Sequence, residues 1–291
     1  MPEEWTLGRL LAWTTDYLKQ QGAESPRLDA EILLATARGC QRIELYTSFD
    51  ELADAATRER FRELVRRRAE GTPVAYLVGH KEFYSLSFRV TPDVLIPRPE
   101  TELLVVRLLD LAKQRSAESG PISIADVGTG SGIIAICAAR SLPNARVSAL
   151  DISPAALSIA RENAARHGVA ERIEWFQSDL FAAVPADRRF DIVASNPPYV
   201  SSAEFAKLPV TVRNFEPRQA LEAGPRGTEI IERLVPVAAE RLTAGGWLLM
   251  EISPMIDHAV RKLLENESTL ELHPTTKDLA GLPRVVQARK K

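Results

Sequence analysis

Residues 122–132 read Ile-Ser-Ile-Ala-Asp-Val-Gly-Thr-Gly-Ser-Gly. The apolar run that ends at Val127 predicts a buried strand, and the glycines after it lead into a helix predicted over 132–141. Glycine lets the backbone turn sharply and approach a ligand closely, where the helix N-terminus offers unpaired N–H groups. The stretch therefore predicts a strand, a ligand-binding loop and a helix in succession, as in an α/β fold.

The sequence that follows alternates between short apolar runs and helical patterns. Such alternation predicts a mostly parallel sheet with helices on both faces, whose ligands bind at the carboxyl ends of the strands. A second helix is expected at 154–166. Strands are expected at 122–127, 146–150, 173–176, 191–195, 247–252, 270–272 and 285–288.

The first 80 residues carry a different pattern, in which apolar side chains recur at helical spacing. Ser25-Pro26 suits a helix start, with serine as the cap and proline in the first turn. Gly71-Thr72-Pro73 breaks the pattern, and strand-like runs on both sides of Thr91-Pro92-Asp93 predict a β-hairpin within 82–97. We expect a helical domain at 1–80, a hairpin linker at 81–98 and an α/β domain at 99–291.

The composition is that of a globular chain with almost no net charge. Its 291 residues are 45% hydrophobic, and 37 Lys and Arg face 39 Asp and Glu. This balance argues against bulk electrostatic attraction to nucleic acid or to an anionic membrane. The sequence shows no signal peptide and no apolar run near the ~20 residues of a membrane span. Only Cys40 and Cys137 are present, in different segments, so we expect a cytoplasmic protein without disulfides or a metal site.

An acidic residue follows the second predicted strand of the α/β domain. Asp151 lies near the ~20-residue offset at which a carboxylate meets a ribose hydroxyl, although it could instead cap the helix that begins at Ser153-Pro154. The loop lacks the Gly-Lys-Ser/Thr of a Walker loop, and Ile133 stands where a dinucleotide fingerprint has its third glycine. A nucleoside-like ligand of another type is therefore indicated.

A Gly-x-Gly-x-Gly loop preceded by Asp126 resembles that of the Rossmann-like, class I S-adenosylmethionine-dependent methyltransferases. The resemblance implies S-adenosylmethionine as cofactor, with its ribose held by Asp151. It also implies that Asp179 meets the adenine amino group and that Leu180 packs on the adenine; a helix cap and an ordinary core leucine are the alternatives. The loop residues that would pass the amino-acid moiety of the cofactor are Gly128, Thr129, Gly130, Ser131 and Gly132.

The strand predicted at 191–195 runs directly into Asn196-Pro197-Pro198-Tyr199. Two prolines cannot donate backbone hydrogen bonds, so the chain leaves the sheet rigidly with its carbonyl groups free as acceptors. We expect the Asn196 side-chain oxygen and the Pro197 carbonyl each to accept one N–H of a planar NH2 group, with Tyr199 stacked on its face. This clamp would orient the nitrogen for methyl transfer without a metal. A rigid loop with no catalytic role is the alternative.

Asn-Pro-Pro-Tyr is similar to the signature of methyltransferases that act on exocyclic or amide NH2 groups, in adenine or in protein glutamine. Residues 73–84 and 94–102 resemble the interdomain stretch of the protein-(glutamine-N5) methyltransferases that modify peptide chain release factors. Asp278–Gly281 and Arg284–Val286 are similar to the C-terminal strand region of that family. The likeness runs from about residue 70 to the end of the chain.

This second resemblance implies a protein substrate, namely the glutamine of the Gly-Gly-Gln tripeptide in class 1 release factors. It implies that the hairpin and residues 96–101 line the cofactor pocket and the groove for the tripeptide, with Arg98, Glu100 and Thr101 as groove residues. Residues 1–80 are expected to dock the body of the release factor. The chain departs from the family pattern at two places, Ser253-Pro254 after Glu251-Ile252 and Pro225-Arg226 before Gly227.

Other functions remain open at this point. The tetrapeptide Asn196–Tyr199 also fits an adenine-N6 methyltransferase on DNA or RNA, or a glutamine methyltransferase of another protein such as a ribosomal protein. A non-catalytic scaffold that binds the cofactor or RNA is a further possibility. The near-zero net charge and the lack of a basic, aromatic-rich region for an extruded base count against direct nucleic-acid binding.

Overall fold

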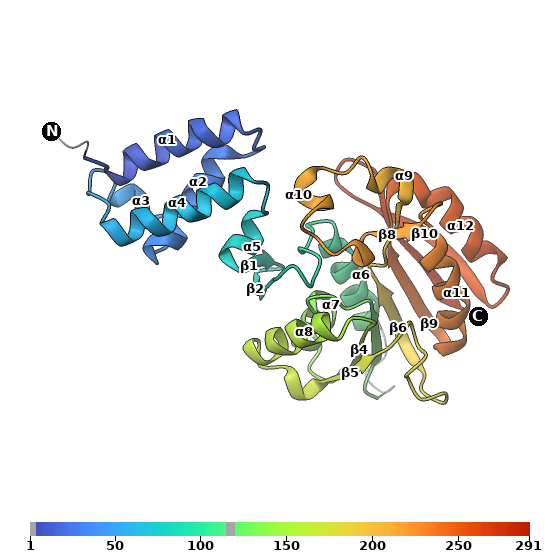
Figure 1. Cartoon of the computed structure of the whole chain (residues 1–291). Coiled ribbons are helices and arrows are strands. Elements are labelled where there is room, and N and C mark those ends of the chain that lie inside the picture. The colour runs from blue at the N-terminus through green and yellow to red at the C-terminus, as the bar shows by residue number, and fades with distance from the viewer. Residues whose placement is uncertain (1–3, 115–119) are drawn as a thin grey trace. The chain divides into compact units, whose positions relative to one another are not determined.

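A seven-stranded sheet forms the centre of the larger of two compact units (Figure 1). The computed structural model describes residues 4–114 and 120–291. The smaller unit consists of the residues up to His80 together with Pro209–Phe215, and the larger one of Lys81–Leu208 and Glu216–Lys291. Pro209–Phe215, which the sequence places within the α/β domain, thus belongs to the smaller unit.

The strands of the central sheet are β3 (Ser123–Val127), β4 (Arg146–Asp151), β5 (Ile173–Gln177), β6 (Phe190–Ser195), β9 (Leu242–Glu251), β10 (Leu270–Lys277) and β11 (Pro283–Lys290). Each predicted strand is confirmed, and the last three are longer than expected. Their order is β10-β11-β9-β6-β3-β4-β5, with parallel pairing from β9 to β5 and antiparallel pairing of β11 on both sides. The chain runs outward from β3 to β5 and returns beside β3 with β6, so the strand order switches direction between β3 and β6.

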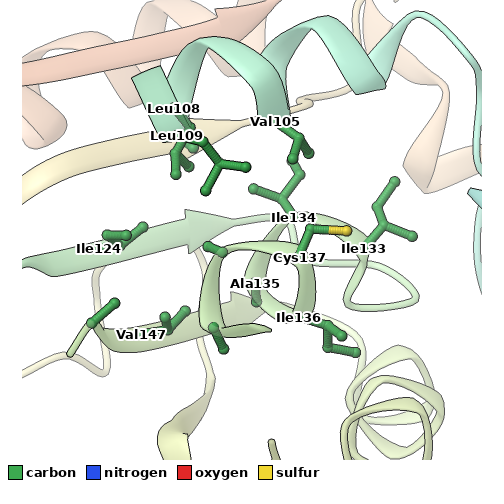
Figure 2. Close-up of a cluster of buried hydrophobic side chains, with 14 of the residues drawn as sticks. Val105, Leu108, Leu109, Ile124, Ile133, Ile134, Ala135, Ile136, Cys137 and Val147 are labelled. Carbon is green, nitrogen blue, oxygen red and sulfur yellow. The ribbon is translucent and has the colours of Figure 1, made fainter. Parts of the chain in front are cut away.

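Helices cover both faces of this sheet because successive strand residues point to opposite sides. Ile124 and Ile192 belong to one buried cluster, and their neighbours Ala125 and Val193 belong to another. Figure 2 shows the first cluster, in which side chains of α6 and α7 lie over β3 and β4. The long helices of this unit are α6 (Thr101–Gln114), α7 (Ile133–Ser141), α8 (Pro154–Arg166), α11 (Glu229–Arg241) and α12 (Asp257–Asn266).

Short elements fill the connections of the larger unit. A two-stranded parallel ribbon, β7 with β8, precedes α11. The short elements are β7 (Val200–Ser201), α9 (Ser202–Phe205), β8 (Glu222–Gly224) and the 3₁₀ turns η2 (Ala170–Arg172), η3 (Arg218–Ala220) and η4 (Pro254–Ile256).

The smaller unit is helical, as its sequence pattern predicts. Leu11, Leu18, Leu33 and Leu34 are buried in its core, which Phe61 completes from a third helix. Its helices are α1 (Leu7–Gln20), α2 (Pro26–Arg38), α3 (Glu44–Thr47), α4 (Ala55–Ala69), α5 (Val74–Val78) and α10 (Val210–Arg213).

The hairpin lies earlier in the chain than the sequence predicts. Its strands are β1 (His80–Phe83) and β2 (Leu86–Arg89), and residues 90–100 contain no strand. Tyr84 and Ser85 both have positive φ, 49° and 58°, which is the geometry of a two-residue turn that matches the twist of its strands. Because neither residue is Gly or Asn, the turn gives no sequence signal, whereas Thr91-Pro92-Asp93 gave a misleading one.

The glycine loop consists of residues 128–132. Its last residue, Gly132, lies where α7 approaches α8. Its φ is 87°, and a Cβ atom there would lie 2.9 Å from Cδ1 of Ile136 and 3.2 Å from Cβ of Ala160. Glycine is therefore required twice at this position, for its left-handed backbone and for the space between the two helices.

We expect Gly132→Ala to lower the free energy of unfolding by about 2–5 kcal/mol, because left-handed strain and overpacking add together. Gly168→Ala is the matched control: its φ is 69°, but the new Cβ would meet no atom within 4 Å. It should lose only the strain component, about 1–2 kcal/mol. Urea unfolding of both variants measures the difference, and equal losses would contradict this account.

Candidate functional site

A cavity of about 340 Å³ opens beside the carboxyl ends of β3, β4, β5 and β6, in the larger unit. Open α/β sheets bind their ligands at such a switch in strand order. Loops after all four strands contribute to its wall, as do the segment before α6 and the start of α11. The lining residues lie within 93–101, 127–134, 151–156, 178–180, 195–198, 217–222 and 230–234.

The glycine loop forms one wall of this cavity. The backbone N–H groups of Gly128 and Thr129 donate to the Leu150 carbonyl at 2.8 and 2.9 Å, which ties the loop to the end of β4. Gly128 and Gly130 have φ values of 74° and 55°, and a Cβ atom on either would meet nothing within 4 Å. The loop therefore presents bare backbone to open space, where a ligand can approach it closely.

Asp126, just before the loop, is fully buried. Its Oδ2 accepts hydrogen bonds from the Thr129 hydroxyl at 2.7 Å and from the Ala135 N–H at 3.0 Å. Its Oδ1 has no hydrogen-bond partner among the described residues. Burial raises the pKa of this carboxyl to about 7. Asp126 thus holds the loop against the first turn of α7.

Asp151 connects the glycine loop to the start of α8. Its Oδ2 accepts from the Gly130 N–H at 2.8 Å and its Oδ1 from the Ser153 N–H at 2.9 Å. Burial raises the pKa of this carboxyl. The cap of α8 is Ser153, whose hydroxyl accepts from the Ala156 N–H at 3.1 Å. The alternative interpretation of Asp151 as the helix cap is therefore wrong, and Asp151 lines the cavity instead.

Asp179 and Leu180 line the cavity after β5. No helix follows Asp179, so it is not a helix cap. Its Oδ2 lies 2.6 Å from Nη2 of Arg233, with both side chains about half exposed. Leu180 has a φ of 50° and lies at the edge of a core cluster as well as in the cavity wall. Their contacts with an adenine ring stay a prediction.

The tetrapeptide begins directly beside the glycine loop. Val127 and Ser195 are register partners at the ends of β3 and β6, and the buried Ser195 hydroxyl donates to the Val127 carbonyl at 2.7 Å. Asn196, Pro197 and Pro198 then line the cavity.

Tyr199, in contrast, is not among the residues that line the cavity. Its ring packs at the edge of a core cluster, and its hydroxyl lies 3.3 Å from Oε1 of Glu251. Burial raises the pKa of the Tyr199 phenol, which keeps it neutral and able to donate. Stacking of this ring on a substrate stays a prediction.

The segment that follows the hairpin supplies two of the three expected groove residues. Arg98 and Thr101 line the cavity, and Nη2 of Arg98 lies 2.5 Å from Oε1 of Glu216. Oε2 of Glu216 accepts from the Ile96 N–H at 3.1 Å. Glu100 is not in the cavity wall; its carboxylate lies 4.0 Å from Nη2 of Arg284.

The hairpin formed by β1 and β2 does not line the cavity, but residues within 93–97 of the segment predicted as a hairpin do. The hairpin is held on α8 instead, because buried Asn163 accepts from the Arg89 N–H at 2.7 Å and donates to the Arg89 carbonyl at 3.1 Å. The same side chain donates to the Ser131 carbonyl at 2.9 Å. The hairpin is therefore connected to the glycine loop through Asn163, which bonds to both.

Two buried glutamates near the cavity were missed by sequence reasoning. Glu216 anchors Arg98, and Glu251 ends β9 beside the tetrapeptide. Glu251 is 2% exposed, and burial raises its pKa to about 7. Glu251 belongs to the Glu251-Ile252 pair already noted in the sequence, but its contact with Tyr199 comes from the tertiary structure, as do the contacts of Glu216 with Arg98 and Ile96. Across residues 4–114 and 120–291, no three His, Cys, Asp or Glu side chains gather as metal ligands would, and no helix is long and apolar enough to cross a bilayer.

Two family models match the sequence: a PrmC N-terminal domain over residues 9–79 and a methyltransferase small domain over residues 101–216. The chain is also similar to curated proteins named release factor glutamine methyltransferase. It is 53% identical to that of Rhodopirellula baltica, with 98% of this chain and 97% of the other covered. The identity is 43% for Koribacter versatilis, with 94% and 95% covered, and 39% for Geobacter sulfurreducens, with 99% and 98% covered.

Solved structures share the fold. The hMettl16 catalytic domain, in complex with MAT2A 3′UTR hairpin 6, has a TM-score of 0.55 at 15% identity, covering 79% of this chain and 82% of that one. The T. thermophilus 16S rRNA N2 G1207 methyltransferase RsmC, in complex with AdoMet and guanosine, has a TM-score of 0.52 at 20% identity, covering 73% and 50%. The predicted fold, a class I methyltransferase domain preceded by a helical region, is confirmed.

The buried Asp126 carboxyl should make stability depend on pH. Its pKa in the folded protein is about 7, above the ordinary value of 3.8. The folded protein therefore holds a proton that the unfolded chain releases, so the free energy of unfolding falls as pH rises between these values. We expect Asp126→Asn to reduce the fall between pH 5 and pH 8 by on the order of 3 kcal/mol.

Urea unfolding at the two pH values measures this effect, with Asp278→Asn as the control. Hydrogen bonding from Arg284 lowers the pKa of Asp278, so that carboxyl titrates below this range. The control should leave the pH dependence unchanged. An Asp126→Asn protein whose stability falls as steeply as that of the wild type would contradict the prediction.

Proposed function

We propose that this chain, which belongs to the release factor glutamine methyltransferase family, catalyses a methyl transfer. The methyl group passes from S-adenosylmethionine to a glutamine side chain of a peptide chain release factor. The acceptor atom is the amide nitrogen N5 of the glutamine in the Gly-Gly-Gln tripeptide of class 1 factors. One observation carries this proposal: the end of β6 places Asn196 and Pro197 in the cavity wall, beside the glycine loop that follows β3.

The described residues fit the cofactor. The cavity volume, about 340 Å³, is within the usual range for small-molecule sites, and Gly128 and Gly130 leave room along its wall. We assign the amino-acid moiety to this loop, the ribose hydroxyls to Asp151 and the adenine to Asp179 and Leu180. S-adenosylmethionine supplies an electrophilic methyl group on a positively charged sulfur.

The tetrapeptide supplies two hydrogen-bond acceptors for the substrate amide. Nδ2 of Asn196 donates to Oγ1 of Thr101 at 3.1 Å, which leaves Oδ1 as the end of that side chain without a hydrogen bond among the described residues. Proline has no N–H, so the rigid backbone at Pro197 presents its carbonyl without a competing donor. Each acceptor takes one N–H of the glutamine NH2 group and thereby orients the nitrogen toward the methyl donor.

The same two acceptors address the weak nucleophilicity of an amide. An amide nitrogen reacts slowly because its lone pair is delocalised into the carbonyl group. Acceptors held in place on both N–H bonds increase electron density at nitrogen, and they stabilise the positive charge that develops there as the new bond forms. The nitrogen gains one methyl group and releases one proton.

We expect Asn196→Ala to lower kcat for release-factor methylation by about 100-fold or more, because it removes an acceptor used in the transition state. Its Kd for S-adenosylmethionine, measured by calorimetry, should change by less than about three-fold. Asn144→Ala, at an exposed asparagine of the same unit, is the control and should keep full activity. Wild-type turnover in the Asn196 variant would overturn the clamp, and label transfer to adenine in DNA or RNA but not to release factor would overturn the function.

The smaller unit is proposed to dock the body of the release factor. It carries a hollow of about 390 Å³ whose walls combine aromatic and cationic side chains, including Trp13, Tyr17 and Arg62. Trp13 is 53% exposed and stacks on Tyr17 with ring centroids 5.2 Å apart. Exposed Trp, Tyr and Arg side chains are the types that dominate binding energy in protein interfaces.

Trp13→Ala should raise KM for intact release factor by about ten-fold or more while kcat changes little, because it removes a docking contact and no reacting group. Ile43→Ala is the control in the same unit: Ile43 is 67% exposed but does not line the hollow. Steady-state kinetics with labelled cofactor measures both. An unchanged KM in the Trp13 variant would exclude this docking surface.

A further inference from the structure

Glu251 is a buried carboxylate to which the amide clamp assigns no role. Ser195 of β6 pairs in register with Met250 of β9, so the next residues, Asn196 just after β6 and Glu251 at the end of β9, follow neighbouring positions of the two strands. Glu251 is 2% exposed. Its Oε1 lies 3.3 Å from the Tyr199 hydroxyl, and its Oε2 is buried without a hydrogen-bond partner in the described part of the chain.

Thr101 lies between Glu251 and Asn196 and interacts with both. Its hydroxyl favours the charged form of the Glu251 carboxylate, which opposes the rise in pKa that burial causes. The same Thr101 oxygen accepts from Nδ2 of Asn196 at 3.1 Å. Thr101 is itself fully buried at the start of α6, so no solvent competes for its hydroxyl group.

The hydrogens available for bonding between Glu251, Thr101 and Asn196 decide which way the Asn196 side-chain amide points. A carboxylate can only accept, and a threonine hydroxyl has one hydrogen to donate. With that hydrogen given to Glu251, the Thr101 oxygen can only accept, so the end of Asn196 that faces it must be the NH2 group. Oδ1 of Asn196 then faces away from Thr101, free for the substrate amide.

We propose that Glu251 is a positioning residue that fixes the orientation of the Asn196 side-chain amide through the Thr101 hydroxyl. This inference rests on the proposed function, in which Oδ1 of Asn196 accepts a substrate N–H. A reversed Asn196 would present its NH2 group to the substrate NH2 group, two donors with no acceptor between them. Glu251 thus prevents the reversed orientation of Asn196, in which the site could bind the cofactor but could not hold the substrate amide.

Glu251→Gln tests the role of the carboxylate with almost no change of shape. A buried NH2 group at the position of Oε2 would have no acceptor, so the new amide is expected to turn its NH2 group toward the Thr101 and Tyr199 hydroxyls. Thr101 then accepts from this new amide and gives its hydrogen to Asn196, whose own amide reverses. The charge is lost, but the geometry of the cavity is retained.

We expect Glu251→Gln to lower kcat by about ten-fold or more, with Kd for S-adenosylmethionine and KM for release factor within about two-fold of the wild type. Assays at about pH 8.5 keep Glu251 ionised in the wild type, since its pKa is about 7. Glu31→Gln is the matched control: Glu31 is 5% exposed, accepts the Tyr46 hydroxyl at 2.5 Å and lies in the smaller unit. Its kcat should not change.

Thr101 provides an independent test if Glu251→Gln does not fold. Thr101→Val removes the hydroxyl at constant shape and should lower kcat by about ten-fold, whereas Thr101→Ser should recover most of this loss. In the Thr101→Val background, Glu251→Gln should cost at most about two-fold more, because the connection is already broken. Independent, additive losses would overturn the inference, as would a wild-type kcat in Thr101→Val.

Asn196→Ala, assayed in parallel, separates this inference from the proposed function. If Asn196→Ala loses activity while Glu251→Gln and Thr101→Val keep it, the clamp stands and only the role of Glu251 is excluded. If Asn196→Ala retains wild-type activity, the clamp itself fails, and so does the proposed role of Glu251.

Discussion

The site depends on the side-by-side pairing of β3 and β6, two strands separated in sequence by β4 and β5. Val127 and Ser195 are register partners, joined by a buried hydrogen bond of 2.7 Å from hydroxyl to carbonyl. This register fixes where the glycine loop and the tetrapeptide begin, so a slip of one residue would reverse the face of every side chain in the strand. Asp151 then holds the loop from β4, and Thr101 holds Asn196 from α6. Each later contact refines a position that the two strand ends have already set.

Buried acidic groups divide into two kinds in this protein. In the smaller unit, Asp29 and Glu31 are paired with Arg68 and Arg27 at 2.8 and 2.6 Å, so their charges are compensated. In the larger unit, Glu216 is paired with Arg98 at 2.5 Å, whereas Asp126 and Glu251 are buried with a pKa near 7 and accept hydrogen bonds from hydroxyl and N–H donors without an ion pair among the described residues. Burial of an unpaired carboxyl lowers stability, and such groups concentrate at functional sites. Both of these carboxyls orient a segment of the cavity wall, which is a reason to retain them.

How much of this could be read from the sequence depends on the range of the interactions involved. The strands, the glycine loop, Asp151 and the tetrapeptide follow from local patterns with a known physical basis. The turn at Tyr84 and Ser85 could not be predicted, because neither residue type favours the left-handed conformation and the contacts of Tyr84 are with a core cluster and with Glu102, 18 positions away. Glu216 bonds to residues 118 and 120 positions away, and Glu251 bonds to a tyrosine 52 positions away, so no local spacing reveals these contacts.

The assignment of Pro209–Phe215 to the smaller unit means that the chain crosses between the units three times. Neither unit is a continuous piece of sequence. A Cβ atom on Gly71 would lie 3.2 Å from the Phe215 ring, which shows how closely the inserted segment packs on the helical part. A gene fragment that ends at residue 80 would therefore encode an incomplete unit. Exchange of the smaller unit between relatives would require two matched grafts, and recombination at a single junction would not preserve the unit.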